Sequence, residues 1–243
     1  MKKLHTTLAA ASLMVLSQPA FSAAGVAVGH FAPFADANTA GSTSVTVKVD
    51  GVDALTDFEF GDIAEDIELA EGHYLIEIYP TGEMTPAISR NVNLKGGKSY
   101  TLAAIGDGVN QSLKLLKVEQ DTVPDPSNAK LFVGHVAPFN NTDAAVDVCT
   151  DAGSAVLADF KYEDYTDPYL TLPPGDYDLQ IRVADVTPCA GALALDIPSI
   201  RLAAGDIVDV YAIGLANNWP LSVASTTGFT LSPDASVYVA HFA

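Results

Sequence analysis

A short motif occurs three times in this sequence. It reads Val-Gly-His-Phe-Ala-Pro-Phe at residues 28–34 and Val-Gly-His-Val-Ala-Pro-Phe at residues 133–139, and it begins again as Val-Ala-His-Phe-Ala at residues 239–243. Its histidines are 105 and 106 residues apart, far more than a solenoid repeat of roughly 20 to 50 residues, so each unit can enclose its own hydrophobic core. We therefore expect tandem domains with a repeated marker at a strand end. The marker residues are His30, Pro33, His135, Pro138 and His241.

Both copies consist of short alternating segments. Val45, Val47 and Val49 alternate with polar residues, which places the three valines on one face of a strand, and residues 146–150 repeat this segment. Glycine-bearing turns follow at near-regular intervals, and no stretch has a convincing helical periodicity. The sequence predicts an all-β protein with two tandem immunoglobulin-like or prealbumin-like β-sandwich domains of about seven strands each.

The N-terminus has the parts of a secretory signal peptide. Lys2 and Lys3 precede an apolar run at residues 8–16, and residues 20–22 supply a small-residue cleavage pattern. No later apolar run reaches the roughly 20 residues that cross a bilayer as a helix. We expect a periplasmic or secreted protein that does not span a membrane.

A polar stretch with two prolines separates the copies, which is typical of a linker. The expected segments are a signal peptide at 1–23, a first β-sandwich repeat at 24–118, a linker at 119–129, a second β-sandwich repeat at 130–231, and an incomplete third repeat strand at 232–243.

Cys149 and Cys189 are the only cysteines, and both lie in the second repeat. An even pair in an exported protein favours a disulfide, and two buried thiols are the alternative. Two distant cysteines without clustered histidines do not form a tetrahedral metal site, so we expect no metal. Because Lys48 stands at the position of Cys149 in the first repeat, we interpret the bond as a local staple and not as an active site.

The chain carries 12 basic and 30 acidic residues, and this balance would repel phosphate backbones. We expect no nucleic-acid partner. Acidic residues gather near turns in both copies, and calcium is one interpretation, but the two sets do not superpose and no Asp-x-Asp-x-Asp-Gly loop occurs. We therefore expect no cofactor, with calcium as the alternative. The two sets are Asp50, Asp53, Asp57 and Asp143, Asp147, Asp151.

An ordered set of motifs runs through both copies. Each has a strand ending in His-x-Ala-Pro, an alternating strand, Leu-x-x-Gly-x-Tyr at residues 69–74 or 172–177, and a later Leu-x-x-Gly. This set resembles the bacterial secreted repeat family catalogued as domain of unknown function 4397, over residues 26–118 and 130–225. The resemblance implies an exported, envelope-associated β-sandwich protein with no assigned reaction, and it supplies no catalytic residues. The family usually has Asp after the proline of the marker, and the residues here are Phe34 and Phe139.

Few residues point to a chemistry. His30 and His135 could each contact a metal or a partner, but one histidine per domain is not a metal site, and a histidine at a strand end more often holds a turn. No Gly-x-Ser-x-Gly elbow occurs, and Trp219 could stack on a sugar or plug the end of a sandwich. We expect a non-enzymatic envelope or extracellular binding or structural module, with a protein or glycan of the envelope as partner. The alternatives are a hydrolase acting on polysaccharide or peptide, and a fibre or matrix subunit that self-associates by exchanging the strand at residues 237–243.

Overall fold

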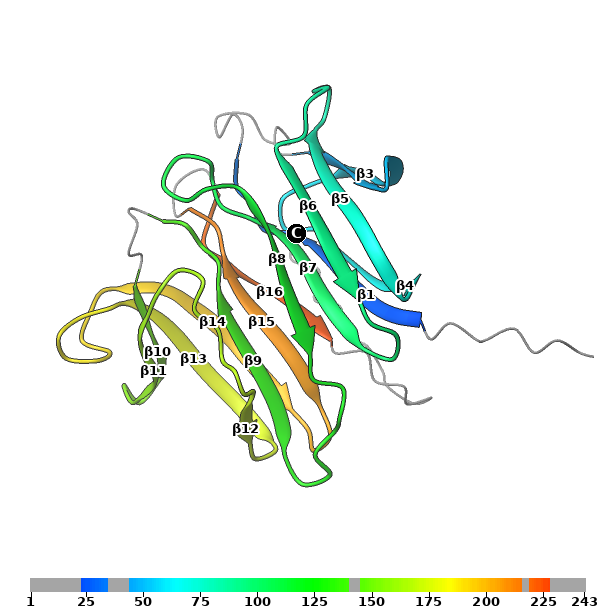
Figure 1. The fold of residues 1–243 in the computed structure, drawn as a ribbon. Coiled ribbons are helices and arrows are strands. Elements are labelled where there is room, and N and C mark those ends of the chain that lie inside the picture. Colours follow the sequence, from blue (N-terminus) through cyan, green and yellow to red (C-terminus); the bar gives the residue numbers. More distant parts are fainter. Residues whose placement is uncertain (1–22, 35–43, 140–144, 216–218, 228–243) are drawn as a thin grey trace, which may run out of the picture.

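The computed structural model describes residues 23–34, 44–139, 145–215 and 219–227. These residues form sixteen β-strands and no helix, arranged as two β-sandwiches of eight strands each (Figure 1). The predicted all-β fold with two tandem sandwiches is confirmed, with one strand more per sandwich than the sequence suggested. The first sandwich contains β1 (Ala23–His30), β2 (Val45–Val49), β3 (Val52–Phe58), β4 (Ile63–Ala70), β5 (Gly72–Pro80), β6 (Ile88–Leu94), β7 (Ser99–Ile105) and β8 (Lys114–Gln120). The second contains β9 (Ala129–His135), β10 (Val146–Thr150), β11 (Ala155–Phe160), β12 (Leu170–Leu172), β13 (Gly175–Val183), β14 (Leu193–Leu202), β15 (Ile207–Ile213) and β16 (Ser222–Thr227).

The two sandwiches have the same strand order. In the first, an outer sheet β3-β2-β5-β6 faces an inner sheet β4-β1-β7-β8. In the second, the outer sheet is β11-β10-β13-β14 and the inner sheet is β12-β9-β15-β16. The pairs β1–β7 and β9–β15 are parallel, and the other paired strands are antiparallel. Each strand of the first sandwich therefore has a counterpart eight strands later.

Strand β2 shows how the sequence pattern produces a sandwich layer. Val45 and Val47 are buried between the two sheets, as the period-two alternation predicts. Asp50 and Gly51 then connect β2 to β3 with φ angles of 50° and 80°. Two residues with positive φ form the hairpin turn that best matches strand twist, and Asp-Gly adopts this turn at little cost. The valine face and the turn together fix the register of the hairpin.

The two inner sheets pack against each other in the middle of the molecule (Figure 1). Every residue of β7 is buried, which requires that both faces of its sheet are covered. Leu102 belongs to the core of the first sandwich, while Ala103 and Ile105 join the core of the second. The Phe31 and Tyr211 rings lie 5.2 Å apart across the interface. The two sandwiches therefore share apolar packing as well as a covalent connection.

The connection between the sandwiches is tied down at its start. Strands β8 and β9 leave residues 121–128 between them, inside the stretch 119–129 predicted as a linker. The Asp121 N–H donates to the Tyr169 hydroxyl at 3.2 Å, and the Asp121 carboxylate pairs with the Lys130 ammonium at 2.5 Å. These bonds attach the connection to the second sandwich.

Several predicted features fall outside the described residues. They are residues 1–22 of the signal peptide, Asp143, and the incomplete third repeat strand at 232–243 with His241. The described part of the chain offers no helix with the length and apolarity needed to cross a membrane.

Candidate functional site

The histidine markers attach a turn to the end of each inner sheet. The His30 N–H donates to the Asp62 carbonyl at 3.0 Å, and the His30 carbonyl accepts from the Gly61 N–H at 2.8 Å. His135 makes the equivalent two bonds with the turn after β11, at 2.9 and 2.7 Å. Beyond His30, a tight turn around Pro33 is closed by a 2.9 Å main-chain bond. The backbone of the marker thus joins the inner sheet to the turn that follows the edge strand of the outer sheet.

Both imidazoles lie in aromatic surroundings, and each histidine is 1% exposed. The His30 ring centre lies 5.6 Å from that of Phe34 and 6.4 Å from that of Phe58. The His135 ring centre lies 5.6 Å from that of Phe139. Phe34 and Phe139 occupy the position where the resembled family usually has Asp, so in this chain that position supplies a ring contact. The structure places both histidines in the interior of their sandwiches.

A cavity of about 220 Å³ lies between the two sheets of the first sandwich. Seven of the eight strands contribute to its wall, and His30 is the only lining residue with a polar side chain. Apolar residues of the inner strands, such as Leu102 and Ala104, face Val47 and Ile78 of the outer sheet across the space. The alternation that predicted a core face also supplies the wall of this cavity.

The cavity reaches solvent along the side bounded by β3 and β4. These are the edge strands of the two sheets, whereas the opposite edges, β6 and β8, meet where the Arg90 guanidinium donates to the Leu115 carbonyl. Lining residues that keep solvent exposure lie mostly at the open side. They include Val49, Ala54, Leu55, Ile67 and Leu69. The mouth is therefore framed by two strand edges to which no other described strand pairs.

The equivalent space in the second sandwich is much smaller. Among the residues that the structure describes, about 10 Å³ remains beside His135, which is room for one water molecule at most. Side-chain size changes in both directions at equivalent lining positions. Val210 and Val223 are smaller than Leu102 and Leu115, whereas Leu131 and Val156 are larger than Val26 and Ala54. The edge strand also differs, since β12 has three residues and β4 has eight. We attribute the lost volume to the larger residues and the shorter edge strand together.

The predicted disulfide is present in the second sandwich. Cys149 of β10 is bonded to Cys189 in the loop between β13 and β14, with a Cα–Cα distance of 6.0 Å. The buried Asp147 supports the same loop, because its carboxylate accepts the N–H groups of Asp159 and Cys189, both at 2.9 Å. Asp147, a candidate calcium ligand from the sequence, therefore accepts hydrogen bonds inside the protein.

Buried polar residues meet where the inner sheets pack, and we call them the interdomain polar cluster: Thr101, Gln120, Asp209, Tyr211 and Thr226. The Gln120 amide nitrogen lies 3.1 Å from both the Thr101 hydroxyl and the Asp209 carboxylate, and 3.4 Å from the Thr226 hydroxyl. Thr101 and Asp209 occupy equivalent positions of β7 and β15. The sequence pattern did not predict this cluster, although an acidic residue, Asp209, inside the otherwise apolar strand β15 is a signal for it.

Burial raises the pKa of Asp209 to about 6. The nearby Tyr169 phenol, Gln120 amide and Tyr211 phenol offset part of this rise, and the nearby Asp121 adds to it. Burial also raises the pKa of the Tyr169 and Tyr211 phenols above their ordinary value, so both remain proton donors. The interface thus contains one carboxyl group that changes charge in mildly acidic solution.

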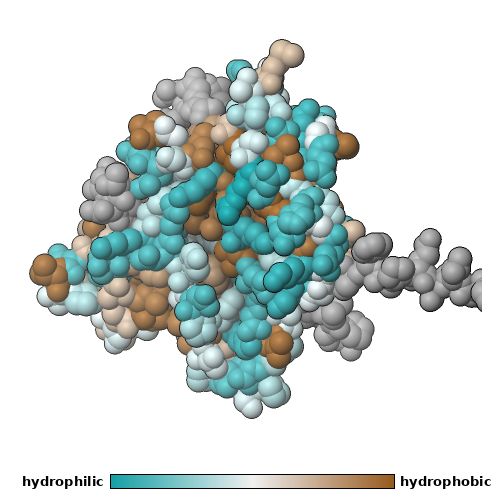
Figure 2. Space-filling model, in the orientation of Figure 1, coloured by the Kyte–Doolittle hydropathy of each residue, from teal (hydrophilic) through white to brown (hydrophobic). Residues whose placement is uncertain are grey.

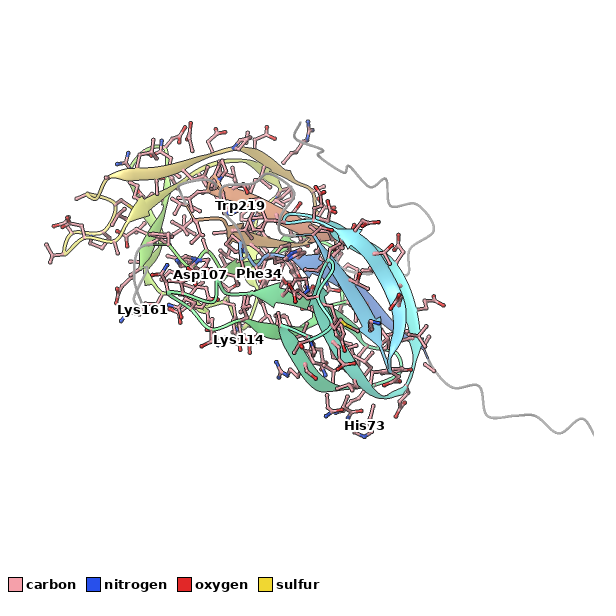
Figure 3. The ribbon with its side chains drawn as sticks, turned by 90° about the horizontal axis from the view of Figure 1, so that it is seen from above. Phe34, His73, Asp107, Lys114, Lys161 and Trp219 are labelled. Atoms are coloured by element: carbon pink, nitrogen blue, oxygen red, sulfur yellow. A yellow bond between two sulfur atoms is a disulfide. The ribbon has the colours of Figure 1, made fainter. Side chains whose placement is uncertain are left out.

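Trp219 packs across the same junction. Its ring centre lies 5.2 Å from that of Phe60 in an edge-to-face arrangement. Figure 3 places Trp219, Phe34 and Asp107 near the middle of the molecule and His73 at a far end. Asp107 accepts three main-chain N–H bonds from its own loop. The half-buried tryptophan fills a gap between the sandwiches, where its ring is not displayed as an open platform.

Acidic residues of the first repeat make local bonds. The Asp50 carboxylate accepts a main-chain N–H of β5 at 2.8 Å, and the Asp53 carboxylate pairs with the Lys48 ammonium at 3.1 Å. Asp57 and its counterpart Asp159 adopt positive φ angles of 53° and 50°, next to register shifts of the hairpins. Within the described ranges, no group of three or more His, Cys, Asp or Glu residues could hold a metal ion.

Hydrophilic residues cover the middle of the face shown in Figure 2, with hydrophobic residues scattered between them. An ion pair crosses the junction at the surface, where the Lys114 ammonium lies 2.5 Å from the Glu163 carboxylate. The most exposed large apolar side chains, Met84 and Val186, stand in the equivalent loops β5–β6 and β13–β14. These tips are isolated, and single exposed apolar residues are ordinary on protein surfaces.

No curated protein matches the chain. Among solved structures, it is similar to one titled "The Bacillus anthracis TIE protein", at 12% identity and a TM-score of 0.23. That similarity covers 79% of this chain and 34% of the other, so the chain spans about a third of its length. The family comparison covers the first sandwich and the opening strand of the second: residues 24–142 match the model of the family described as Domain of unknown function (DUF4397).

Proposed function

We propose that this protein is an exported, non-enzymatic module of the cell envelope or extracellular space, built from two copies of the DUF4397 repeat. In this proposal the two sandwiches act as one rigid binding or structural unit. The observation that carries it is the interface between the inner sheets, in which β7 is buried on both faces. The N-terminal signal sequence and the disulfide support export, because disulfides persist in oxidising compartments.

The composition of the interface supports rigidity. Domains that move relative to each other usually meet through small, polar interfaces. Here Phe31 and Ala103 of the first sandwich pack into one cluster with Tyr211 of the second. Separation would expose this apolar surface to water and break the bonds of the interdomain polar cluster. The module would therefore present its two outer sheets to a protein or glycan partner in one fixed orientation.

A hydrolase receives less support from the same geometry. Glycoside hydrolysis usually needs two carboxyl groups that flank a substrate in a cleft. The cavity of the first sandwich instead has His30 as its only polar lining side chain. The buried carboxylates of Asp147 and Asp209 are engaged by donors of the protein itself.

The test of the rigid unit is whether both sandwiches unfold together. We expect urea unfolding followed by far-UV circular dichroism to coincide with unfolding followed by Trp219 fluorescence, because a shared core couples the two sandwiches. Ala103→Asp, which puts a charge into the interface, should separate the two transitions. Thr56→Asp, on the exposed face of β3, is the matched control and should leave them coincident. Separate transitions in the unmodified protein would contradict the proposal.

Export is tested by expression of the full chain in a Gram-negative host. We expect the protein in the periplasmic or extracellular fraction, with a mass that corresponds to removal of about the first 23 residues. A full-length protein retained in the cytoplasm would contradict the localisation.

A further inference from the structure

We propose that the cavity of the first sandwich binds a small, uncharged, apolar molecule, of the size of a monocyclic aromatic or a short hydrocarbon. This goes beyond the proposed function, because the inner-sheet interface would hold the two sandwiches together whether or not the cavity is occupied.

The volume of the cavity limits the size of the ligand. Protein interiors are close-packed, and voids larger than a water molecule are few. The space of about 220 Å³ is far above that level. An apolar cavity of about 150 Å³ in another protein stays dry and binds benzene. A ring compound with a few additional carbon atoms therefore fits the first sandwich, and a long acyl chain does not.

The residues that line the cavity limit the charge and polarity of the ligand. Outer-sheet residues such as Val47 and Ile78 and inner-sheet residues such as Leu102 and Ala104 offer no hydrogen-bonding side chain. A charged group in this space would lose its hydration without compensation, which strongly disfavours its binding. His30 is the single position where a small polar substituent of the ligand could be met. The ligand is therefore uncharged.

The residues at the mouth of the cavity disfavour anionic ligands. The exposed residues of β3 and β4, the strands that frame the mouth, include Asp57, Asp66 and Glu68, besides Asp53, whose charge the Lys48 ammonium balances. Carboxylates at the entrance repel an anion on its way in. A carboxylate-bearing analogue should therefore bind more weakly than the corresponding neutral molecule, which separates this site from one for fatty acids.

The second sandwich provides an internal control. It has the same topology and a His135 that corresponds to His30, yet it keeps only about 10 Å³ of space. A ligand that merely partitions into hydrophobic interiors would perturb both sandwiches. A ligand that recognises the cavity would perturb only the first.

The experiment is a benzene titration of the full mature chain, followed by NMR of labelled isoleucine methyl groups. We expect saturable shifts at Ile67, Ile76 and Ile78, which line the cavity, and none at Ile181 and Ile213 of the second sandwich. Benzoate should bind at least tenfold more weakly than benzene. Absence of saturable shifts, equal shifts in both sandwiches, or benzoate binding as tight as benzene binding would overturn the proposal.

Two variants change the volume in opposite directions. Ala104→Leu fills the cavity and should weaken benzene binding at least tenfold, while Ala212→Leu at the equivalent position of the second sandwich should leave it within twofold. Leu102→Ala enlarges the cavity and should let naphthalene bind at least tenfold more tightly than it binds the unmodified protein. Circular dichroism checks that each variant is folded, and Leu102→Ala keeps the test decisive if Ala104→Leu does not fold. Unchanged affinities in the folded variants would overturn the site.

Discussion

The two sandwiches share a topology but differ in what stabilises them. The first has a long edge strand, β4, and an apolar cavity of about 220 Å³, whereas the second has a three-residue edge strand, almost no internal space and a disulfide. Their histidine markers, edge turns and parallel central pairs coincide. The two copies therefore share strand order and the closing turn, whereas packing density and covalent support both differ between them.

The largest test of this comparison removes the disulfide. Cys149 and Cys189 are 40 residues apart in sequence, and a cross-link of this span stabilises a fold by about 4 kcal/mol. We expect Cys149→Ala with Cys189→Ala to lower the free energy of unfolding by roughly this amount, measured by urea denaturation with Trp219 fluorescence. Lys48→Ala, at the equivalent position of the first sandwich, is the control and should have a much smaller effect. Equal effects would show that the second copy does not depend on its staple.

The next test concerns a glycine that both copies share. A Cβ atom added at Gly29 would lie 2.5 Å from the Phe31 ring, and one at Gly134 would lie 2.9 Å from the Tyr211 ring. Because these rings meet at the interface, Gly29→Ala and Gly134→Ala should each cost about 1–3 kcal/mol by overpacking, with the larger loss at Gly29. Thermal unfolding measures both, and Gly72→Ala controls for loss of glycine alone, because a Cβ added there would lie 3.6 Å from Tyr74, an ordinary contact, and its φ is not positive. If Gly29→Ala left stability unchanged, the side chains at the interface would be shown to shift enough to accommodate an extra methyl group.

The third test uses the pH dependence of the interface. The folded protein holds the pKa of Asp209 at about 6, above the value of 3.8 for an exposed Asp. Between these values the folded state binds more protons than the unfolded state, so this group lowers the free energy of unfolding as pH rises through the window. Asp209→Asn should abolish that loss. The stability of the variant relative to the unmodified protein should therefore rise by roughly 2–3 kcal/mol between pH 4 and pH 8.

In the first sandwich, Thr101 occupies the position equivalent to Asp209. Because Thr101 does not titrate, the pH dependence belongs to the second sandwich. Urea unfolding at each pH, with Thr101→Val as a control that removes a neutral partner, separates titration from lost hydrogen bonding. If Asp209→Asn and the unmodified protein keep a constant stability difference across this range, Asp209 does not titrate in the interface.

Local rules predicted the features that depend on neighbours in sequence. The alternation of Val45 and Val47 predicted the core face, and the even cysteine count, together with the expected export, predicted the Cys149–Cys189 bond. The cavity was not predicted, because the alternation that marks core-facing residues is the same in both copies and does not show how much space remains between the two sheets. The interdomain packing was not predicted, because a period-two pattern does not show that both faces of a sheet are covered. The burial of β7 on both faces is nevertheless consistent with its small and apolar residues.

The smallest expected effect concerns the surface pair that crosses the junction. The Lys114 and Glu163 side chains are 44% and 35% exposed, so water and salt screen their attraction. Glu163→Gln should lower stability by less than about 1 kcal/mol, and 0.5 M NaCl should remove the difference. The matched pair Lys98–Glu119 lies within the first sandwich, so Glu119→Gln reports an ion pair that joins no domains. If Glu163→Gln alone separated the unfolding transitions followed by circular dichroism and by Trp219 fluorescence, the junction would depend on this ion pair more than on its apolar core.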